Sequence, residues 1–482
     1  MSSYTALPAH EPDDSLDPQH QLRVEEPPQS SSPPYKRIAL LVLGFFVVAF
    51  GFYKAGQFSV SYPPSQQEPG KDPQPGETIT MPRDGKYSVG YFVNWGIYGR
   101  KYPPSLIPAQ DLTHILYAFA NVNAGSGEVS LSDLWADQDI HYTGDSWNEP
   151  AGNLYGNLKQ LYLIKKQNRH LKIMLSIGGW TYSPSFHPVV VNPSLRAKFV
   201  ASAVRLLADY GFDGLDVDYE YPQNDEQARG YVSLLAELRQ GLDDYARRNN
   251  YNYKFLLTIA APCGVDNYNR LHVMEMDRYL DIWNMMAYDF SGSWDKTAGH
   301  QANLFGQPLS VSQAINWYVQ KGVSRDKIVV GVPLYGRSFT STDGPGSSFN
   351  GVGQGTWESG VYDYRTLPLP GSHVLRDEAI GASWSYDYGR KEMVSYDTEE
   401  VAQWKGAWIA QQGLAGSMFW ELSGDKGGPR EGLTESGFGK DYQDGRSLVK
   451  VVKDSMGGKL DSTPNWLQYG TSKFPNMASG MQ

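Results

Sequence analysis

Eight short apolar runs separated by helix-length spacers constrain the fold of this chain more than any other feature. They cover residues 87–93, 115–120, 173–176, 214–219, 255–260, 282–287, 328–333 and 416–420. Helical patterns are expected between them at 155–167, 193–210, 226–249, 311–320 and 398–411. Alternating strands and helices form a parallel sheet, and eight such units close a (β/α)8 TIM barrel, expected over residues 85–457. A doubly wound open sheet is the alternative, but no Gly-rich phosphate loop follows the first strand.

The connection between the seventh and eighth strands is too long for one βα unit. Residues 339–395 are rich in Gly, Ser, Tyr and Pro, and they contain a strand-like piece at 382–388. A structureless loop of this length with so many aromatic residues is unusual in a compact domain. We therefore expect an α+β insertion between strand 7 and helix 7, at the catalytic end of the barrel.

The segment from Asp213 to Glu220 places four carboxylates within eight residues. Asp216, Asp218 and Glu220 alternate with Leu, Val and Tyr, which is a strand period, so these three carboxylates project from one face. Three like charges roughly 7 Å apart in a half-buried position should raise the pKa of at least one of them. A carboxylic acid still protonated near neutral pH is what acid catalysis requires. A Ca²⁺ loop would carry Gly and Asn between its ligands, and an exposed edge strand fits poorly with the aliphatic alternates.

Several notable residues lie at or just beyond the ends of other expected strands, where barrel enzymes carry their chemistry. These residues are Ser176, Gly178, Gly179 and Trp180 at the end of the third strand, Met286, Tyr288 and Asp289 at the end of the sixth, Tyr335 and Arg337 beyond the seventh, and Trp420 at the end of the eighth. Each residue alone fits a structural role, such as a core position for Trp420 or an ion pair for Arg337. Their common position at one end of the barrel favours a catalytic site.

Four motifs resemble those of glycoside hydrolase family 18, especially its fungal endochitinase-like members. They are Ser-Ile-Gly-Gly at 176–179, Phe-Asp-Gly-Leu-Asp-Val-Asp-Tyr-Glu at 212–220, Met-Ala-Tyr-Asp-Phe at 286–290 and Gly-Val-Pro-Leu-Tyr-Gly-Arg at 331–337. The resemblance extends from about residue 87 to about residue 456. It implies a chitinase that cleaves β-1,4 bonds between N-acetylglucosamine units with retention of configuration. The nucleophile would be the acetamide of the substrate, which forms an oxazolinium intermediate.

The resemblance also implies roles for individual residues. Glu220 matches the general acid and base, Asp218 the residue that holds the acetamido N–H, and Asp216 its inner partner. Tyr288 matches the hydroxyl that contacts the acetamido oxygen. The substrate-binding positions matched are Tyr91, Trp180, Met286, Asp289, Tyr335, Arg337 and Trp420, with Trp420 as the hydrophobic floor under the scissile sugar. The structural signature positions matched are Asp213, Ser176, Gly178 and Gly179. Independently of the family, Asp218 stands beside Glu220 on one strand, which places it poorly for attack from the far face of the sugar.

Two other hypotheses for the function compete with chitin hydrolysis. A chitin-binding lectin on the same barrel is the first, but lectins of this lineage typically lack the acid, and Glu220 is present here with both aspartates. A transglycosylase acting in cell-wall remodelling is the second, because it shares the intermediate. Endo-acting cleavage of N-glycan cores is a further related activity. The insertion and the Tyr-Gly-Arg segment at 335–337 favour a chitin-binding cleft instead.

The composition disfavours several other classes of function. The net charge of −10 and the lack of a basic stripe argue against a nucleic-acid partner. The nine His residues show no metal-ligand spacing, so neither a metal nor a cofactor is expected. The single cysteine, Cys263, cannot form an intrachain disulfide, and its apolar context is typical of a packed thiol.

The N-terminal residues predict a membrane attachment. Residues 1–37 are rich in Pro, Ser and Gln and are expected to be a disordered cytoplasmic tail. Residues 38–53 carry no charge and predict a transmembrane signal-anchor that crosses the lipid bilayer, and 54–84 predict a Pro-rich stalk. Lys36 and Arg37 favour a cytoplasmic N-terminus, hence a single-pass type II protein with an extracellular or lumenal catalytic domain, open to release by cleavage in the stalk. Residues 458–482 form a polar C-terminal tail to which no structure is assigned.

Overall fold

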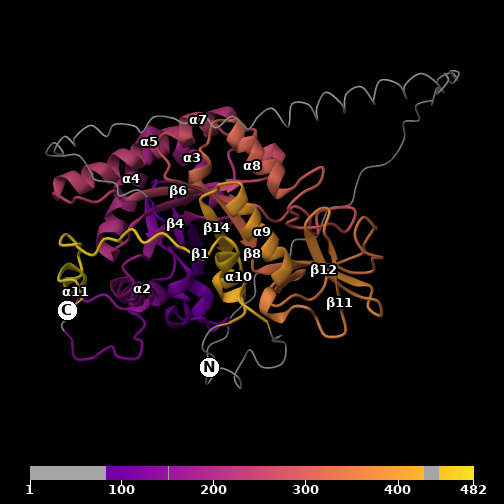
Figure 1. Cartoon of the computed structure of the whole chain (residues 1–482). Coiled ribbons are helices and arrows are strands. Elements are labelled where there is room, and N and C mark those ends of the chain that lie inside the picture. The colour runs from indigo at the N-terminus through magenta and orange to yellow at the C-terminus, as the bar shows by residue number, and fades with distance from the viewer. Residues whose placement is uncertain (1–82, 150, 428–444, 482) are drawn as a thin grey trace, which may run out of the picture. The chain divides into compact units, whose positions relative to one another are not determined.

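Eight parallel strands close into a barrel, which the computed structural model describes within residues 83–149, 151–427 and 445–481 (Figure 1). The strands are β1 (Tyr87–Val93), β2 (His114–Val122), β4 (Lys172–Gly178), β5 (Gly214–Asp218), β6 (Leu256–Pro262), β7 (Ile282–Met286), β8 (Ile328–Pro333) and β14 (Gly416–Trp420). Each pairs in parallel with the next, and the ring closes because β1 pairs with both β2 and β14. The predicted (β/α)8 TIM barrel is confirmed.

Helices surround the barrel, and several of them begin at a capping side chain. They are α2 (Gly156–Gln167), α3 (Phe186–Val191), α4 (Pro193–Tyr210), α5 (Asp225–Arg248), α6 (Val265–Tyr268), α7 (Val273–Met276), α8 (Val311–Gln320), α9 (Glu399–Gln411), α10 (Leu448–Ser455) and α11 (Pro475–Ala478). Helix α4 starts where the Asn192 side chain accepts the N–H groups of Ser194 and Leu195. It ends at Gly211, whose φ of 77° is one that glycine adopts without strain. These two signals explain why its bounds were predictable.

Short helical segments and one small strand fill the connections. They are η1 (Asn94–Ile97), η2 (Pro104–Leu106), η3 (Ala109–Asp111), η4 (Trp135–Asp139), η5 (Ser183–Ser185), η6 (Arg325–Lys327), η7 (Tyr364–Thr366), η8 (Leu422–Gly424) and β3 (Val129–Leu131). Strand β3 pairs antiparallel with the end of β2. The segment with β3 and η4 was not predicted, because it has no hydrophobic period.

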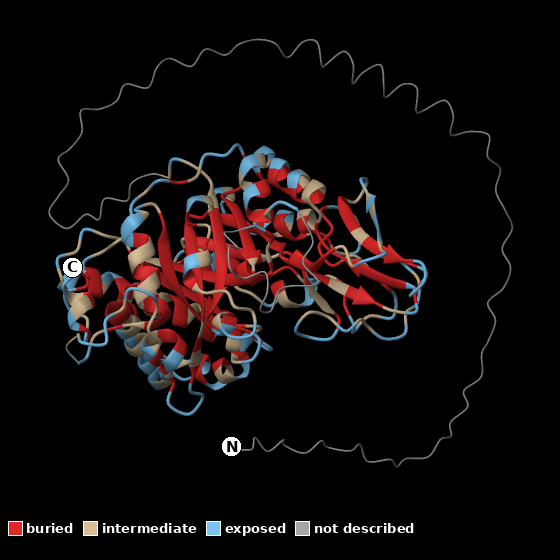
Figure 2. Ribbon diagram, turned by 90° about the horizontal axis from the view of Figure 1, so that it is seen from below, coloured by how far each residue is buried: buried red, intermediate tan, exposed pale blue. Residues whose placement is uncertain are grey.

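The strands are buried on both faces, as Figure 2 shows by the red ribbons at the centre. Their inward side chains, including Val89, Met174 and Met418, form one cluster inside the barrel. Their outward side chains, including Phe92 and Leu215, join the helices in a second and larger core. Burial on both faces explains the near-continuous apolar runs of the sequence.

The insertion is an antiparallel sheet of five described strands. They are β9 (Tyr335–Phe339), β10 (Val361–Asp363), β11 (His373–Asp377), β12 (Ala382–Asp387) and β13 (Glu392–Ser395), in the order β10-β9-β13-β12-β11. The only helical segment among these strands is η7, so the sheet carries less helix than the predicted α+β insertion. The sheet also starts earlier than residue 339, which places Tyr335 and Arg337 on its first strand.

The C-terminal tail is ordered, although the sequence assigned it no structure. Leu460 forms a β-bridge with Lys86, just before β1. The Asn465 side chain donates to the carbonyl oxygens of Lys165 and Leu171 at 2.8 and 2.7 Å. The backbone N–H of Trp466 donates to Asp213 at 2.8 Å. The tail therefore crosses the N-terminal ends of β1, β4 and β5, held by single polar contacts that leave no periodic signal.

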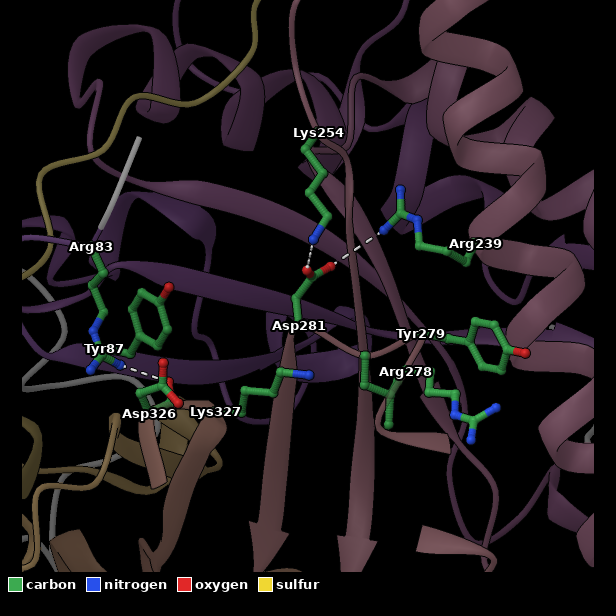
Figure 3. A pocket seen from close by; sticks show the side chains of 10 residues that line it. Arg83, Tyr87, Arg239, Lys254, Arg278, Tyr279, Asp281, Asp326 and Lys327 are labelled. Atoms are coloured by element: carbon green, nitrogen blue, oxygen red, sulfur yellow. Dashed lines mark hydrogen bonds and ion pairs between the residues drawn. The ribbon is translucent and has the colours of Figure 1, made fainter. Parts of the chain in front are cut away.

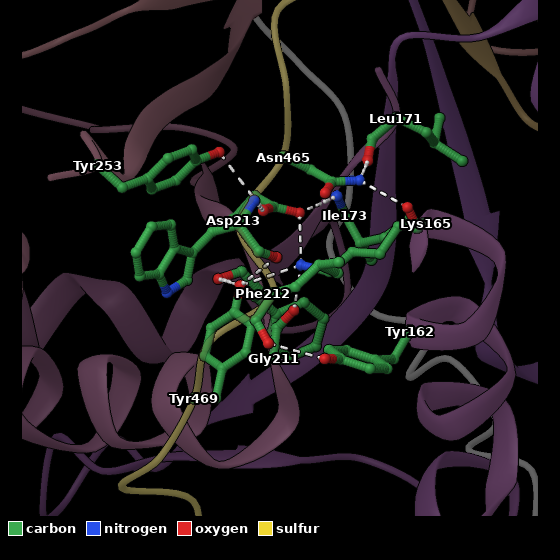
Figure 4. Close-up of polar contacts among 12 residues, drawn as sticks. Tyr162, Lys165, Leu171, Ile173, Gly211, Phe212, Asp213, Tyr253, Asn465 and Tyr469 are labelled. Carbon is green, nitrogen blue, oxygen red and sulfur yellow. Dashed lines mark hydrogen bonds and ion pairs between the residues drawn. The ribbon is translucent and has the colours of Figure 1, made fainter. Parts of the chain in front are cut away.

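Asp213 lies at this N-terminal end, directly before β5, and Figure 4 shows its polar contacts. Its carboxylate accepts from the ammonium of Lys165 and the backbone N–H of Ile173, both at 2.8 Å. The same ammonium donates to the carbonyl of Gly211 at 2.8 Å and to the hydroxyl of Tyr469 at 3.0 Å. Burial lowers the pKa of Lys165 to about 8, and the charge of Asp213 acts against that fall. Asp213 therefore ties the starts of β4 and β5 to the C-terminal tail.

Replacing Lys165 by methionine should destabilise the fold by about 3–5 kcal/mol, because it leaves the Asp213 charge buried without its cation. Urea unfolding measures this loss. Lys166→Met is the matched control, since Lys166 is exposed and, among the described residues, donates to the carbonyls of Gly480 and Met481 alone. Equal stability of the two variants would show that the buried pair is not what anchors the tail.

A cavity of about 290 Å³ also opens at the N-terminal end of the barrel, between β1, β7 and α5 (Figure 3). The carboxylate of Asp281 lies within it and binds Lys254 and Arg239. It also accepts the backbone N–H of Leu257 at 2.9 Å. These contacts hold the starts of β6 and β7 against α5. We therefore assign the residues that line this cavity a structural role and not a catalytic one.

The predicted membrane segment at 38–53, the tail at 1–37 and nearly all of the stalk at 54–84 lie outside the described residues. Within the three described ranges, the structure contains no helix with the length and apolar character of a bilayer span.

Candidate active site

Asp216 is the buried centre of the site, on the inner face of β5. Its carboxylate accepts hydrogen bonds from four strands: from Thr258 at 2.6 Å, Ser176 at 2.8 Å, and Tyr91 and Asn284 at 3.1 Å each. Burial raises the pKa of Asp216, and these four hydrogen bonds act against that rise. The side chain is thus fixed in one orientation with support for its negative charge.

Asp218 follows two residues later on the same face of β5. Its Oδ1 atom is buried and has no hydrogen-bond partner among the described residues. Burial raises the pKa of Asp218 well above its ordinary value, and the negative charges of Glu220 and Asp216 raise it further. A buried acceptor without a donor is costly, so this atom is suited to receive an N–H from a bound ligand.

Glu220 lies just beyond the end of β5 and is half-buried. Burial raises the pKa of Glu220 to about 7, the charge of Asp289 adds to the rise, and a hydrogen bond from Tyr221 opposes it. The Tyr221 hydroxyl donates to Oε2 at 3.1 Å. The carboxyl pair of Asp218 and Glu220 therefore retains a proton close to neutral pH. Tyr221 was not among the predicted residues, and its position directly after Glu220 is the signal that could have found it.

Gly178, the last residue of β4, and Gly179, the next residue, allow the backbone to approach its neighbours closely. A Cβ atom on Gly178 would lie 2.1 Å from the carbonyl oxygen of Asp218. One on Gly179 would lie 2.7 Å from the ring of Phe119. Both residues also have positive φ angles, of 117° and 78°. A side chain at position 178 would push the end of β4 away from β5, and one at position 179 would push the following loop away from Phe119 in β2.

A second polar group joins β7 to the insertion. Asp289 accepts from the Tyr335 hydroxyl at 2.6 Å and from Nε of Arg337 at 2.5 Å. The Arg337 guanidinium lies 4.8 Å from the ring centre of Trp294. These contacts bring the predicted residues Asp289, Tyr335 and Arg337 together, and they place the insertion beside the site.

Tyr288 stands beside this group with its hydroxyl largely uncommitted. Its only recorded hydrogen bond in the described chain is a weak one of 3.7 Å to the sulfur of Met418. Burial raises the pKa of Tyr288 well above its ordinary value, so the hydroxyl keeps its proton. It is therefore available to donate to a ligand.

Aromatic rings form a wall at the same end of the barrel. The ring of Trp420 lies 5.0 Å from Tyr91 and stacks on Phe119 at 5.6 Å. Phe119 in turn lies 6.2 Å from Trp95, which is 41% exposed. Phe119 and Trp95 were not predicted, because aromatic residues at strand ends are equally common in cores.

The two remaining predicted residues differ in their surroundings. Met286 ends β7 and packs against the cluster inside the barrel. Trp180 follows Gly179 in the β4 loop and is 72% exposed. Within the described ranges, no group of three or more His, Cys, Asp or Glu side chains is arranged to hold a metal ion.

Comparisons with known proteins agree on one family. The family model described as glycosyl hydrolases family 18 matches residues 87–425. "Endochitinase 1" of Metarhizium robertsii is 44% identical over 413 residues, which cover 84% of this chain and 93% of that protein. "Chitinase 1" of Aphanocladium album is 44% identical over 398 residues, covering 81% and 90%.

Solved structures of similar proteins share the fold. A chitinase from Bacillus thuringiensis matches with a TM-score of 0.70 and 29% identity, covering 78% of this chain and 70% of that one. A chitinase mutant from Cycas revoluta, solved in complex with (GlcNAc)4, matches with a TM-score of 0.62 and 26% identity, covering 77% and 99%.

Proposed function

This chain belongs to glycosyl hydrolases family 18, and from that premise we propose that it is a chitinase that hydrolyses β-1,4-linked N-acetylglucosamine polymers with retention of configuration. The observation that carries the proposal is the pair of Asp218 and Glu220. One carboxyl group has a pKa raised to about 7, and its neighbour presents an unpaired buried oxygen. Glu220 serves as the acid, and Asp218 accepts an N–H from the substrate.

Cleavage proceeds in two steps that restore the enzyme. Protonated Glu220 donates its proton to the glycosidic oxygen while the acetamido oxygen of the same sugar attacks C1, so the C1–O bond breaks and an oxazolinium ion forms. Asp218 accepts the acetamido N–H and stabilises the positive charge of the ion. Ionised Glu220 then takes a proton from water. The water oxygen attacks C1 and opens the oxazolinium ring, which restores the acetamido group. Two inversions at C1 give net retention.

The surrounding residues would orient the substrate. The Tyr288 hydroxyl donates to the acetamido oxygen, and Trp420 forms the apolar floor under the scissile sugar. Trp180, Met286 and the hydrogen-bonded group around Asp289 line the binding site. A chitooligosaccharide is the proposed ligand, supported by the (GlcNAc)4 complex of the Cycas relative.

A fluorogenic chitobioside tests the proposal against the lectin alternative. We expect release of the fluorophore, because Asp218 can stabilise the oxazolinium ion and Glu220 is present to activate the water that completes the turnover. Binding of chitotetraose without any release would favour a lectin. A transglycosylase would yield oligosaccharides longer than those supplied, which mass spectrometry detects.

Tyr221→Phe should raise the pKa of Glu220, because it removes the hydrogen bond that lowers it. Since the acid must be protonated, kcat/KM falls as pH rises through this pKa, and the variant should lose activity at higher pH than the wild type. A hydrogen bond of about 1 kcal/mol corresponds to a displacement of about 0.7 pH unit. Tyr219→Phe is the control, since its hydroxyl contacts His187 and Gln227 instead. If Tyr221→Phe lost activity at the same pH as the wild type, the pKa that limits activity at high pH would not be that of Glu220.

The membrane attachment extends the proposal to the cell. We propose that residues 38–53 anchor the protein as a single-pass type II membrane protein, with the stalk carrying an extracellular or lumenal catalytic domain. The uncharged run lies between the basic pair Lys36 and Arg37 and the Pro-rich stalk, and its composition is what supports the anchor.

Carbonate extraction tests the anchor. The full chain should stay in the membrane pellet, whereas a chain truncated to begin near Lys86 should be soluble and active, because the first barrel strand, β1, begins at Tyr87. Recovery of the intact full chain in the supernatant would remove the anchor from the account.

A further inference from the structure

The backbone N–H of Glu220 depends on one side chain from another strand loop. Strand β5 ends at Asp218, so the peptide of Glu220 lies beyond the hydrogen-bond ladder of the barrel. Its N–H donates to the hydroxyl oxygen of Ser183 at 2.7 Å, which is the only acceptor recorded for it in the described chain. Ser183 is the first residue of η5 and is 1% exposed. Water therefore cannot readily replace its hydroxyl.

The Ser183 hydroxyl is itself held in place. It donates to the carbonyl oxygen of Gly179 at 2.9 Å, with a longer contact of 3.4 Å to that of Asp218. The N–H of Gly179 donates to the same Asp218 carbonyl at 2.8 Å. Hydrogen bonds thus link the β4 loop to both ends of the Asp218–Glu220 segment.

Aromatic packing fixes the other end of this loop. Phe186, which begins α3, stacks on the ring of Tyr219 at 5.0 Å with an interplanar angle of 11°. Tyr219 lies between the two carboxylates in sequence, and its ring is buried on the outer side of the strand. The loop that carries Ser183 is therefore held against the 218–220 segment by hydrogen bonds at Ser183 and by ring stacking at Phe186.

We propose that Ser183 is a positioning residue for the acid step. By holding the Glu220 peptide, its hydroxyl aims the carboxyl group at the glycosidic oxygen, without touching the substrate. The inference rests on the proposed function and deepens it. A misplacement of about 1 Å in such a group costs on the order of 10²-fold in rate.

Ser183→Thr and Ser183→Val isolate the hydroxyl, because the two replacements have nearly the same shape and only threonine keeps the acceptor. The readout is kcat/KM on two substrates. Chitotetraose has a sugar alkoxide as leaving group, which needs the proton of Glu220. 4-Nitrophenyl chitobioside releases a phenolate, which leaves without one.

Relative to the threonine variant, the valine variant should lose about 10–100-fold in kcat/KM on chitotetraose and less than about 3-fold on the aryl substrate. A purely structural defect would lower both by the same factor. Ser185→Ala in the same η5 is the control, since the Ser185 hydroxyl makes no hydrogen bond to any described residue, and it should match the wild type on both substrates.

Equal losses on the two substrates would overturn the positioning role, and so would equal activity of the two variants. If the added methyl group prevents both variants from folding, Ser183→Ala against the wild type makes the same comparison. A wild-type enzyme inert towards both substrates would instead overturn the proposed function, and the inference with it.

Discussion

Glu220→Gln lowers kcat on chitotetraose by about 10²–10⁴-fold, the usual contribution of a general acid and base. Glutamine keeps the shape and polarity of the side chain but has no proton to donate at the pH of the reaction. Burial raises the pKa of Glu220 to about 7, so the wild type retains that proton where an exposed carboxyl would have lost it. Single-turnover assays with chitotetraose measure the loss.

Folding and binding should survive this substitution. The side chain of Glu220 accepts only the Tyr221 hydroxyl among the described residues, and an amide oxygen accepts it equally well. Calorimetric affinity for chitotetraose should therefore remain within about 3-fold, since the lost interaction belongs to the transition state. Glu226→Gln makes the same change on an exposed side chain six positions later and should leave kcat unaltered. Substantial turnover by Glu220→Gln would refute its role as the acid.

Asp218→Asn is expected to lower kcat by about 10²–10³-fold for a different reason. An asparagine oxygen can still accept the acetamido N–H, but it carries no negative charge to stabilise the oxazolinium ion. Removing one preorganised electrostatic partner of a transition state costs about this much in other enzymes. The loss should appear in kcat rather than in substrate affinity.

A thiazoline derived from N-acetylglucosamine, which mimics the oxazolinium ion, gives the sharpest readout of this charge. Asp218→Asn should weaken thiazoline binding far more than chitotetraose binding, because only the intermediate is positively charged. Asp266→Asn, on an exposed aspartate of α6, is the control. Equal weakening of both ligands would show that Asp218 serves simply as a polar contact.

Predictions from the sequence were best where one physical signal dominated. The bounds of β1, β8 and β14 follow directly from uninterrupted apolar runs, because a barrel strand is buried on both faces. The alternation of polar and apolar residues in β5 predicts that Asp216 and Asp218 share one face, because successive strand residues point to opposite sides. These are local properties, which a sequence carries without knowledge of the fold.

The missed features depend on contacts between distant segments. Thr258 and Asn284 donate hydrogen bonds to the carboxylate of Asp216. In the sequence they are isolated polar residues within apolar strands, so they were not predicted. An inward-facing polar residue in a buried strand is the signal that could have identified them. Asn465 and Trp466 order the C-terminal tail through single hydrogen bonds, for which no periodicity exists.

The most direct measurement is the titration of Glu220 by carbon NMR of labelled carboxyl groups, with Glu220→Gln to assign the signal and Asp218→Asn to remove its neighbour. The account predicts a midpoint near 7 in the wild type, which changes when Asp218 loses its charge because the two groups titrate as a pair. A midpoint close to the ordinary value of 4.5, unaltered in Asp218→Asn, would contradict it.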